Sequence, residues 1–253
     1  SILPSKPIEV GNTRQLLMDN HIVDSAWNCF RTVHQPEKHP GNPLIKTPED
    51  PRGFQKGFEG CIIYDEETKI FRAWGNGWNL KRPKFDMSLV NTYYESEDGV
   101  NWTAPELGIV EYEGSRANNI IQGEKGVNCG VPSVVEVPAR PKHRGRYAML
   151  YGFSSEKLEP GTTHTMEQRI AFSEDGVHFK DQPENPVIKG RSDCDNNFVY
   201  NPERDVFMMY RRATVNAHEI RRIAYSESKD LVNWTQPEVI PVSYTHLRAH
   251  ETV

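Results

Sequence analysis

One local pattern occurs three times along the chain. An alternating strand runs into a tight turn and is followed by an aromatic residue at 94–102, again at 172–179 and, less regularly, at 225–234. The turns contain Asp-Gly in the first two copies, a dipeptide typical of β-hairpins, and Lys-Asp in the third. A repeat has to be recognised before single elements are assigned, because it decides the architecture of the whole chain.

Two further patterns keep the same order relative to the first. Short segments that begin with Asn-Pro or Asn-Asn and continue into an apolar pair occupy 42–46, 118–122 and 185–189. Aromatic-rich strands occupy 70–74, 146–151 and 206–210. Three patterns in constant order, spaced by roughly 50 to 80 residues, define one repeated four-stranded unit. Such a unit is typical of a β-propeller blade.

The repeat divides the chain into a lead-in strand segment at 1–41 and a partial propeller at 42–241. Its three units are expected at 42–112, 113–184 and 185–240. Propellers typically have about four to eight blades, so three units indicate a truncated one. The alternative is a β-sandwich with similar hairpins. Helical periodicity is weak throughout, which argues against helical bundles and α/β folds.

The last residues do not look like native protein sequence. Residues 242–253 resemble the translation of a sequencing adapter, and we expect the native sequence to stop near Ile240. An ordinary exposed tail is the alternative. His246 and His250 have helical spacing but are therefore not interpreted as metal ligands.

Charge and composition limit the class of partner. The net charge of −5 argues against a nucleic acid or an anionic membrane as partner. The short basic stretch at 140–146 is interpreted as a solvated turn. The four cysteines are far apart and lack zinc-ligand spacing, so neither a metal nor a cofactor is expected.

The cellular location stays open. No apolar run approaches the roughly 18 residues of a membrane span, and no leader peptide is visible. The chain opens at Ser1 without methionine, so a leader could have been lost, and a secreted or periplasmic location is compatible with the sequence. The oligomeric state is not predicted.

Three segments carry a resemblance to known proteins. They are Leu-Met-Asp-Asn-His-Ile-Val at 17–23, the His- and Pro-rich segment at 34–43, and Ser192-Asp193 followed by Asn196-Asn197. Over about residues 10–240 the chain resembles an uncharacterised bacterial group of glycoside hydrolase-like proteins related to families 32 and 43. The resemblance implies a five-bladed β-propeller, of which about three blades are present, and a carbohydrate substrate. It also implies three central acids, one from each of the first three blades, acting as base or nucleophile, modulator and general acid.

Aligning the inner strands identifies the candidate acids. Glu59 of the first unit is equivalent to Asp195 of the third, and Asp193 stands two residues earlier. Glycoside hydrolysis needs two carboxyl groups flanking one bond, and one must stay protonated to act as acid. For each of these acids the alternative is a turn carboxylate bonded to backbone amides. The second unit has Val131 or Gly130 at the equivalent position and therefore no matching acid.

Loops at the same end of the units could hold a sugar. The candidate substrate-binding residues are Trp78, Arg82, His164, Arg211, Arg212 and His218. Trp78 could stack on a sugar ring, and either arginine of the 211–212 pair could hold a carboxylate or phosphate group. A solvated loop residue is the alternative at the loop positions, and pairing with a carboxylate of the blade is the alternative for Arg211 and Arg212.

The sequence thus predicts a glycoside hydrolase with Glu59 as base or nucleophile and Asp193 or Asp195 as acid. A non-catalytic carbohydrate-binding propeller is one alternative, which the missing second-unit acid favours. A glycoside phosphorylase with Arg211 or Arg212 as phosphate ligand is another. The repeated turn acids Asp98, Asp175 and Asp230 are interpreted as structural, because a motif present in every unit belongs to the scaffold.

Overall fold

The structure is a computed structural model, and it describes residues 11–12, 23, 25–32, 34–45, 58–83, 86–138, 144–155, 167–189, 196–212 and 223–240. The chain divides into two units, 1–40 and 41–253. In the first unit the described residues form turns and bends, without helix or strand. All the strands described below belong to the second unit.

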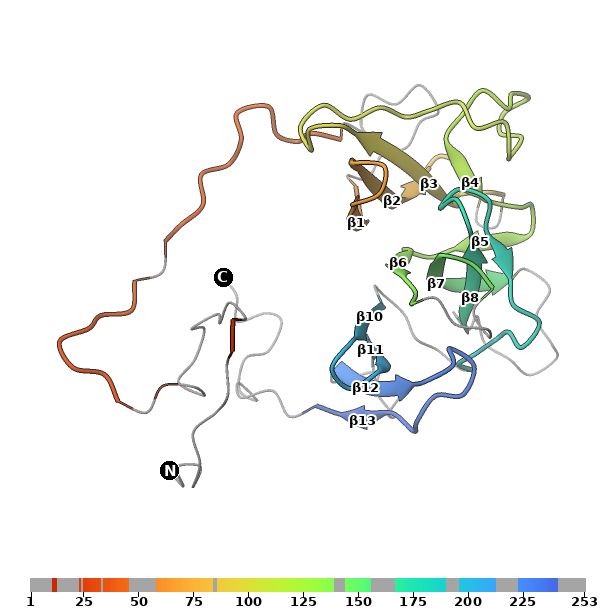
Figure 1. Cartoon of the computed structure of the whole chain (residues 1–253). Coiled ribbons are helices and arrows are strands. Elements are labelled where there is room, and N and C mark those ends of the chain that lie inside the picture. Colours follow the sequence, from red (N-terminus) through yellow and green to blue (C-terminus); the bar gives the residue numbers. More distant parts are fainter. Residues whose placement is uncertain are drawn as a thin grey trace. The chain divides into compact units, whose positions relative to one another are not determined.

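The first sheet has four antiparallel strands in the order β1-β2-β3-β4 (Figure 1). Its strands are β1 (Gly60–Asp65), β2 (Ile70–Trp78), β3 (Leu89–Ser96) and β4 (Ile120–Gln122). The sequence places 118–122 at the start of the second unit, whereas β4 pairs with β3 and is the outer strand of the first sheet. The first sheet therefore extends beyond residue 112, to Gln122.

The second sheet has five strands, of which two share one neighbour. Its strands are β5 (Val127–Cys129), β6 (Ser133–Glu136), β7 (Tyr147–Ser155), β8 (Glu167–Ser173) and β9 (Lys180–Asp181). Both β5 and β6 pair with β7, and the ladder between them is interrupted around Pro132. Proline has no N–H to donate to the ladder, which accounts for the interruption.

The third sheet repeats the order of the first, as β10-β11-β12-β13. Its strands are β10 (Asn197–Asn201), β11 (Val206–Arg212), β12 (Ile223–Ser228) and β13 (Glu238–Val239). None of the described residues is helical, so the expected all-β class is confirmed. In that part of the chain no helix is long and apolar enough to cross a membrane.

Alternation along β7 gives this central strand two buried faces. In β7 the side chains of Tyr147, Met149 and Tyr151 pack in a cluster with Trp74 of the first sheet. The intervening side chains of β7, among them Leu150, pack in another cluster with the third sheet. Because successive side chains point to opposite faces, an aromatic-rich strand with few charges can fill the space on both sides of its sheet.

The repeated turns have the same hydrogen bonds in all three sheets. In the first, one carboxylate oxygen of Asp98 accepts the amides of Val100 and Asn101 at 2.8 and 2.7 Å, and Ser96 Oγ accepts the amide of Gly99 at 2.9 Å. Asp175 and Asp230 make the same bonds in the turns of the second and third sheets. The interpretation of these acids as structural is confirmed.

Candidate functional site

The strand pairings define which residues are equivalent between sheets. Cys61 lies opposite Trp74, Ser133 opposite Leu150 and Asn197 opposite Tyr210. Three residues of the aromatic strands each lie opposite the serine of a repeated turn, namely Phe71, Tyr147 and Phe207. These three positions are therefore equivalent and align β2, β7 and β11 with one another. Cys61, Ser133 and Asn197 are therefore equivalent positions, as the sequence alignment assumes.

Glu59 comes directly before β1, two residues ahead of Cys61. Its side chain is half-buried, and its carbonyl oxygen accepts the amide of Asn76 at 2.8 Å. This bond continues the pairing of β1 with β2 and fixes Glu59 to the end of the sheet where the inner strand begins. The position in the second sheet two residues ahead of Ser133 is Val131, so this register offers no carboxyl group there.

Several predicted site residues lie outside the described residues. They are Asp193, Asp195, His164 and His218, together with the tail at 242–253. Their assignment as site residues therefore stays a prediction.

The loop after β2 contains Trp78 and Arg82. Trp78 is the last residue of β2, lies opposite Leu89 and is half-buried. Arg82 donates to the carbonyl and carboxylate oxygens of Asp86 at 2.6 and 2.9 Å and to Glu113 at 3.2 Å. Its guanidinium also lies 5.0 Å from the centre of the Tyr112 ring. Arg82 is therefore paired with two acids of the chain, which differs from the solvated loop residue that the sequence offers as the alternative to a sugar ligand.

Arg211 and Arg212 end β11 and point to opposite faces of the third sheet, because they are consecutive in a strand. Arg212 is half-buried. Arg211 is only 5% exposed, and its Nε and Nη1 atoms have no hydrogen-bond partner among the described residues. Burial lowers the pKa of Arg211 from its ordinary value. The structure thus distinguishes two arginines that look alike in the sequence.

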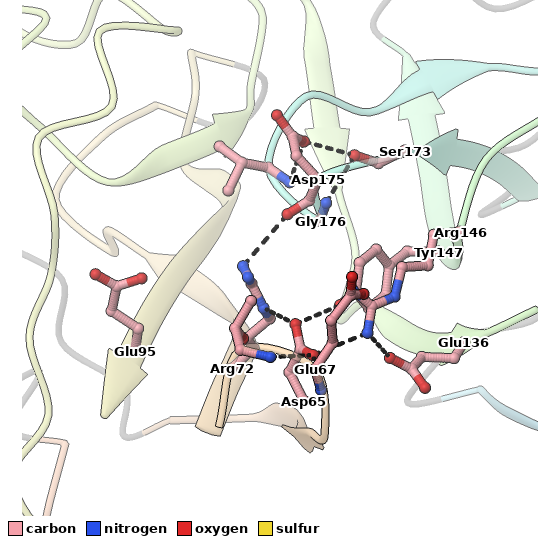
Figure 2. A network of polar contacts seen from close by, with 12 residues as sticks. Asp65, Glu67, Arg72, Glu95, Glu136, Arg146, Tyr147, Ser173, Asp175 and Gly176 are labelled. Carbon is pink, nitrogen blue, oxygen red and sulfur yellow. Dashed lines mark hydrogen bonds and ion pairs between the residues drawn. The ribbon is translucent and has the colours of Figure 1, made fainter. Parts of the chain in front are cut away.

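At the end of β1 that lies away from Glu59, a polar network joins the first two sheets (Figure 2). This network was not predicted from the sequence. Asp65 is fully buried and accepts hydrogen bonds from Arg72 at 2.9 Å, Arg146 at 2.8 Å and Tyr147 at 3.0 Å. Arg146 also contacts Glu67 at 2.8 Å. The interpretation of 140–146 as a solvated turn is wrong for Arg146, because its guanidinium bridges two sheets.

The pKa of Asp65 reflects this environment. Burial alone would raise the pKa, but hydrogen bonds from the Thr68 amide, Arg146 and Arg72 outweigh it and hold the pKa well below its usual range. A carboxylate that stays ionised and fully paired is a structural anchor and a poor proton donor. The only sequence signal for it was the turn at 66–69, which gives no indication of a partner 81 residues away.

No group of three or more His, Cys, Asp or Glu residues within the described segments is arranged to hold a metal ion. Among the described residues, the candidate acid Glu59 is separate from the acids that hold the sheets together. Glu59 lies at the strand-start end, and Asp65 and the repeated turn acids lie at the other end of β1 and in the hairpins.

Comparison with known proteins bears on the fold. No family model matches the chain, and no curated protein matches it in sequence. Among solved structures it is similar to Zg3597, a family 117 glycoside hydrolase produced by the marine bacterium Zobellia galactanivorans, with a TM-score of 0.51 and 14% identity over 79% of this chain and 51% of that one. It is also similar to exo-inulinase from Aspergillus awamori, with a TM-score of 0.50 and 15% identity over 73% of this chain and 36% of that one.

The chain spans 51% of the first of these proteins and 36% of the second. Its described residues form three antiparallel sheets without helix, and these match part of the propeller of glycoside hydrolases. This likeness defines the fold, and the chemistry has to be argued from the residues of the chain itself.

Proposed function

We propose that this chain is part of a glycoside hydrolase that cleaves a glycosidic bond at the end of the sheets where the inner strands begin. Glu59 acts as base or nucleophile, and Asp193 or Asp195 acts as general acid. The observation that carries the proposal is the common strand register, in which Glu59 and Asp195 each stand two residues before equivalent positions of β1 and β10.

The reaction requires a defined separation between two carboxyl groups. Two carboxyl groups have to flank one bond at about 5–5.5 Å for retention or about 6.5–9.5 Å for inversion of the anomeric centre. Inner strands of different propeller blades can present side chains to one central space. Contacts between β6 and both β1 and β10 support this, because they bring the inner strands of consecutive sheets next to each other.

The solved structures support a carbohydrate substrate. One of them is a family 117 glycoside hydrolase, and the other is an exo-inulinase. A fold used by enzymes of this kind is compatible with many substrates, so it supports the class of reaction and leaves the sugar open.

A non-catalytic carbohydrate-binding propeller is the second candidate, and one observation favours it. The strand register gives the second sheet Val131 where the first has Glu59, so the acid expected there to modulate catalysis is missing. A binding protein needs hydrogen-bonding and stacking groups but not a pair of carboxyl groups.

Turnover and binding have to be measured separately on the full chain. Release of nitrophenol from a panel of aryl glycosides in phosphate-free buffer is expected if the chain is a hydrolase. Turnover that requires added phosphate would indicate a phosphorylase and contradict the proposal. Saturable binding of sugars in ligand-observed NMR without turnover of any glycoside in the panel would indicate a binding protein and would also contradict it.

A further inference from the structure

Arg211 occupies an unusual place for a guanidinium group. Phe207 and Met209 of β11 lie in the apolar cluster between the second and third sheets, and strand alternation puts Arg211 on the same face. Only 5% of its surface is exposed. The column of apolar side chains therefore ends in a buried cation.

That cation lacks an acceptor among the described residues. Nε and Nη1 of Arg211 are both buried and have no hydrogen-bond partner within the described part of the chain, and the same holds for Oγ of Ser226. Ser226 lies opposite Met209 on β12, and Arg211 lies opposite Ala224, so Ser226 and Arg211 are diagonal neighbours on one face. Three unsatisfied polar atoms thus share one face of the third sheet.

Arg72, a partly buried arginine of the first sheet, is paired by contrast. The side chain of Arg72 is 13% exposed and donates to Asp65 at 2.9 Å and to the Tyr93 hydroxyl at 2.8 Å. Burying a charge without a partner costs more than burying a paired one, because the lost hydration is not replaced. A buried guanidinium without an internal partner is therefore suited to bind an anion.

The position of Arg211 relates it to the candidate reaction centre. Arg211 is the penultimate residue of β11, and the preceding residue, Tyr210, lies opposite Asn197 at the start of β10. Trp74, the equivalent of Tyr210, lies opposite Cys61, two residues after Glu59. Arg211 therefore stands at the end of its sheet that corresponds to the Glu59 end of the first.

We propose that Arg211, assisted by Ser226, binds the carboxylate of an acidic sugar, so that the substrate is a glycan containing uronic acid residues. This inference rests on the proposed function for the identity of the substrate as a carbohydrate. The guanidinium presents two planar forks, Nε–H with Nη2–H and Nη1–H with Nη2–H, and either one matches a carboxylate, which takes two parallel hydrogen bonds. One cation in a chain of net charge −5 suits a monoanion better than a phosphate dianion.

The test compares acidic and neutral sugars of the same configuration. Binding of D-glucuronate and D-galacturonate to the full chain is measured by ligand-observed NMR against glucose and galactose. We expect the uronates to bind at least about tenfold more tightly, and this preference to disappear in Arg211→Met and to weaken in Arg211→Lys, which keeps the charge but loses the fork. Equal binding of acidic and neutral sugars by the wild-type chain, or an intact preference in Arg211→Met, would overturn the assignment.

Arg204→Met is the matched control. Arg204 lies in the turn between β10 and β11 of the same sheet, its side chain is 54% exposed, and it pairs with Glu227. This variant loses the same charge from the same sheet, and we expect it to keep the uronate preference. Loss of the preference in Arg204→Met as well would mean that overall charge causes it, and would contradict a site at Arg211.

Thermal unfolding distinguishes an external anion bound by Arg211 from a carboxylate of this chain that pairs with Arg211. If a carboxylate of this chain satisfied Arg211, Arg211→Met would leave that carboxylate buried and unpaired and lower the Tm by several degrees. We expect the Tm of Arg211→Met to be equal to or above that of the wild type, and a marked decrease would overturn the assignment. Uronate binding without hydrolysis of any glycoside would contradict the proposed enzymatic function and leave the Arg211 site standing.

Discussion

Trp74 donates a hydrogen bond of 2.6 Å from its indole Nε1 to the carbonyl oxygen of Gly176, which lies 102 residues later in the repeated turn of the next sheet. Arg72, on the same face of β2, donates at 3.3 Å to the carbonyl oxygen of Asp175 in the same turn. The repeated turn thus has two uses. It closes a hairpin in its own sheet, and it accepts hydrogen bonds from the preceding one.

Substituting Gly176 tests this contact. Gly176 has a φ of +78°, and a Cβ atom there would lie 3.1 Å from Cζ2 of Trp74. We expect Gly176→Ala to lower the free energy of unfolding by about 2–3 kcal/mol, because the backbone strain and the close contact add. Urea denaturation followed by tryptophan fluorescence measures it.

Gly108→Ala is the control for backbone strain alone. Gly108 has a similar φ of +72°, but a Cβ atom there would meet no atom within 4 Å. We expect a loss of only about 1 kcal/mol. Equal losses at the two positions would show that the packing of the turn against Trp74 contributes nothing.

Asp65→Asn should be among the most destabilising single substitutions in the described sheets. The change leaves Arg72 and Arg146 without their shared buried carboxylate, and breaking such a pair typically costs about 3–5 kcal/mol. The comparison is Asp86→Asn, whose carboxyl group is 38% exposed and pairs with Arg82. That surface pair is worth about 0–1 kcal/mol. Similar unfolding midpoints in urea for both variants would contradict a central role for Asp65.

The fold should lose stability in acid. For Asp230, burial raises the pKa, but hydrogen bonds from Asn233 and the Val232 amide outweigh it and lower the pKa to about 2. The pKa of Asp65 is also held below its usual range. Both folded-state values lie below the unfolded value of about 3.9, so their stabilisation is complete above the unfolded pKa and is lost as the pH falls toward the folded pKa.

We therefore expect the free energy of unfolding to decrease as the pH falls from about 5 to 2. Asp65→Asn should show a shallower decrease, because its largest acid-sensitive contact is already gone. Urea denaturation at a series of pH values measures both slopes. An unchanged slope in the variant would contradict the assignment of acid sensitivity to Asp65.

Local pattern was sufficient to predict much of the architecture. The alternation around Cys61 and Asn197 and the following turns predicted the inner-strand register that the pairings show. The Asp-Gly dipeptides predicted the hairpins, because their hydrogen bonds form within a few residues of Asp98 and Asp175. Such features depend on neighbouring residues, and the sequence contains them directly.

Long-range contacts were the part that the sequence did not reveal. Arg146 reaches Asp65 across 81 residues, and a basic residue next to Pro and Gly looks like any solvated turn. The outer strand Ile120–Gln122 was predicted to open the second unit, since a strand at the border of two repeats can pair with either neighbour. Arg211 and Arg212 differ only in the face they occupy, and burial of one face depends on packing against another sheet.

We propose that carboxyl groups at the strand-start end carry out glycosidic cleavage. The most direct test of this proposal is kcat/KM of the full chain on an aryl glycoside for the wild type and for Glu59→Gln, with Glu66→Gln as control. Glu66 lies in the turn after β1, and its side chain is 79% exposed. We expect Glu59→Gln to lower kcat/KM by about 100-fold or more and Glu66→Gln to leave it unchanged. Equal activity of the wild type and Glu59→Gln would contradict it.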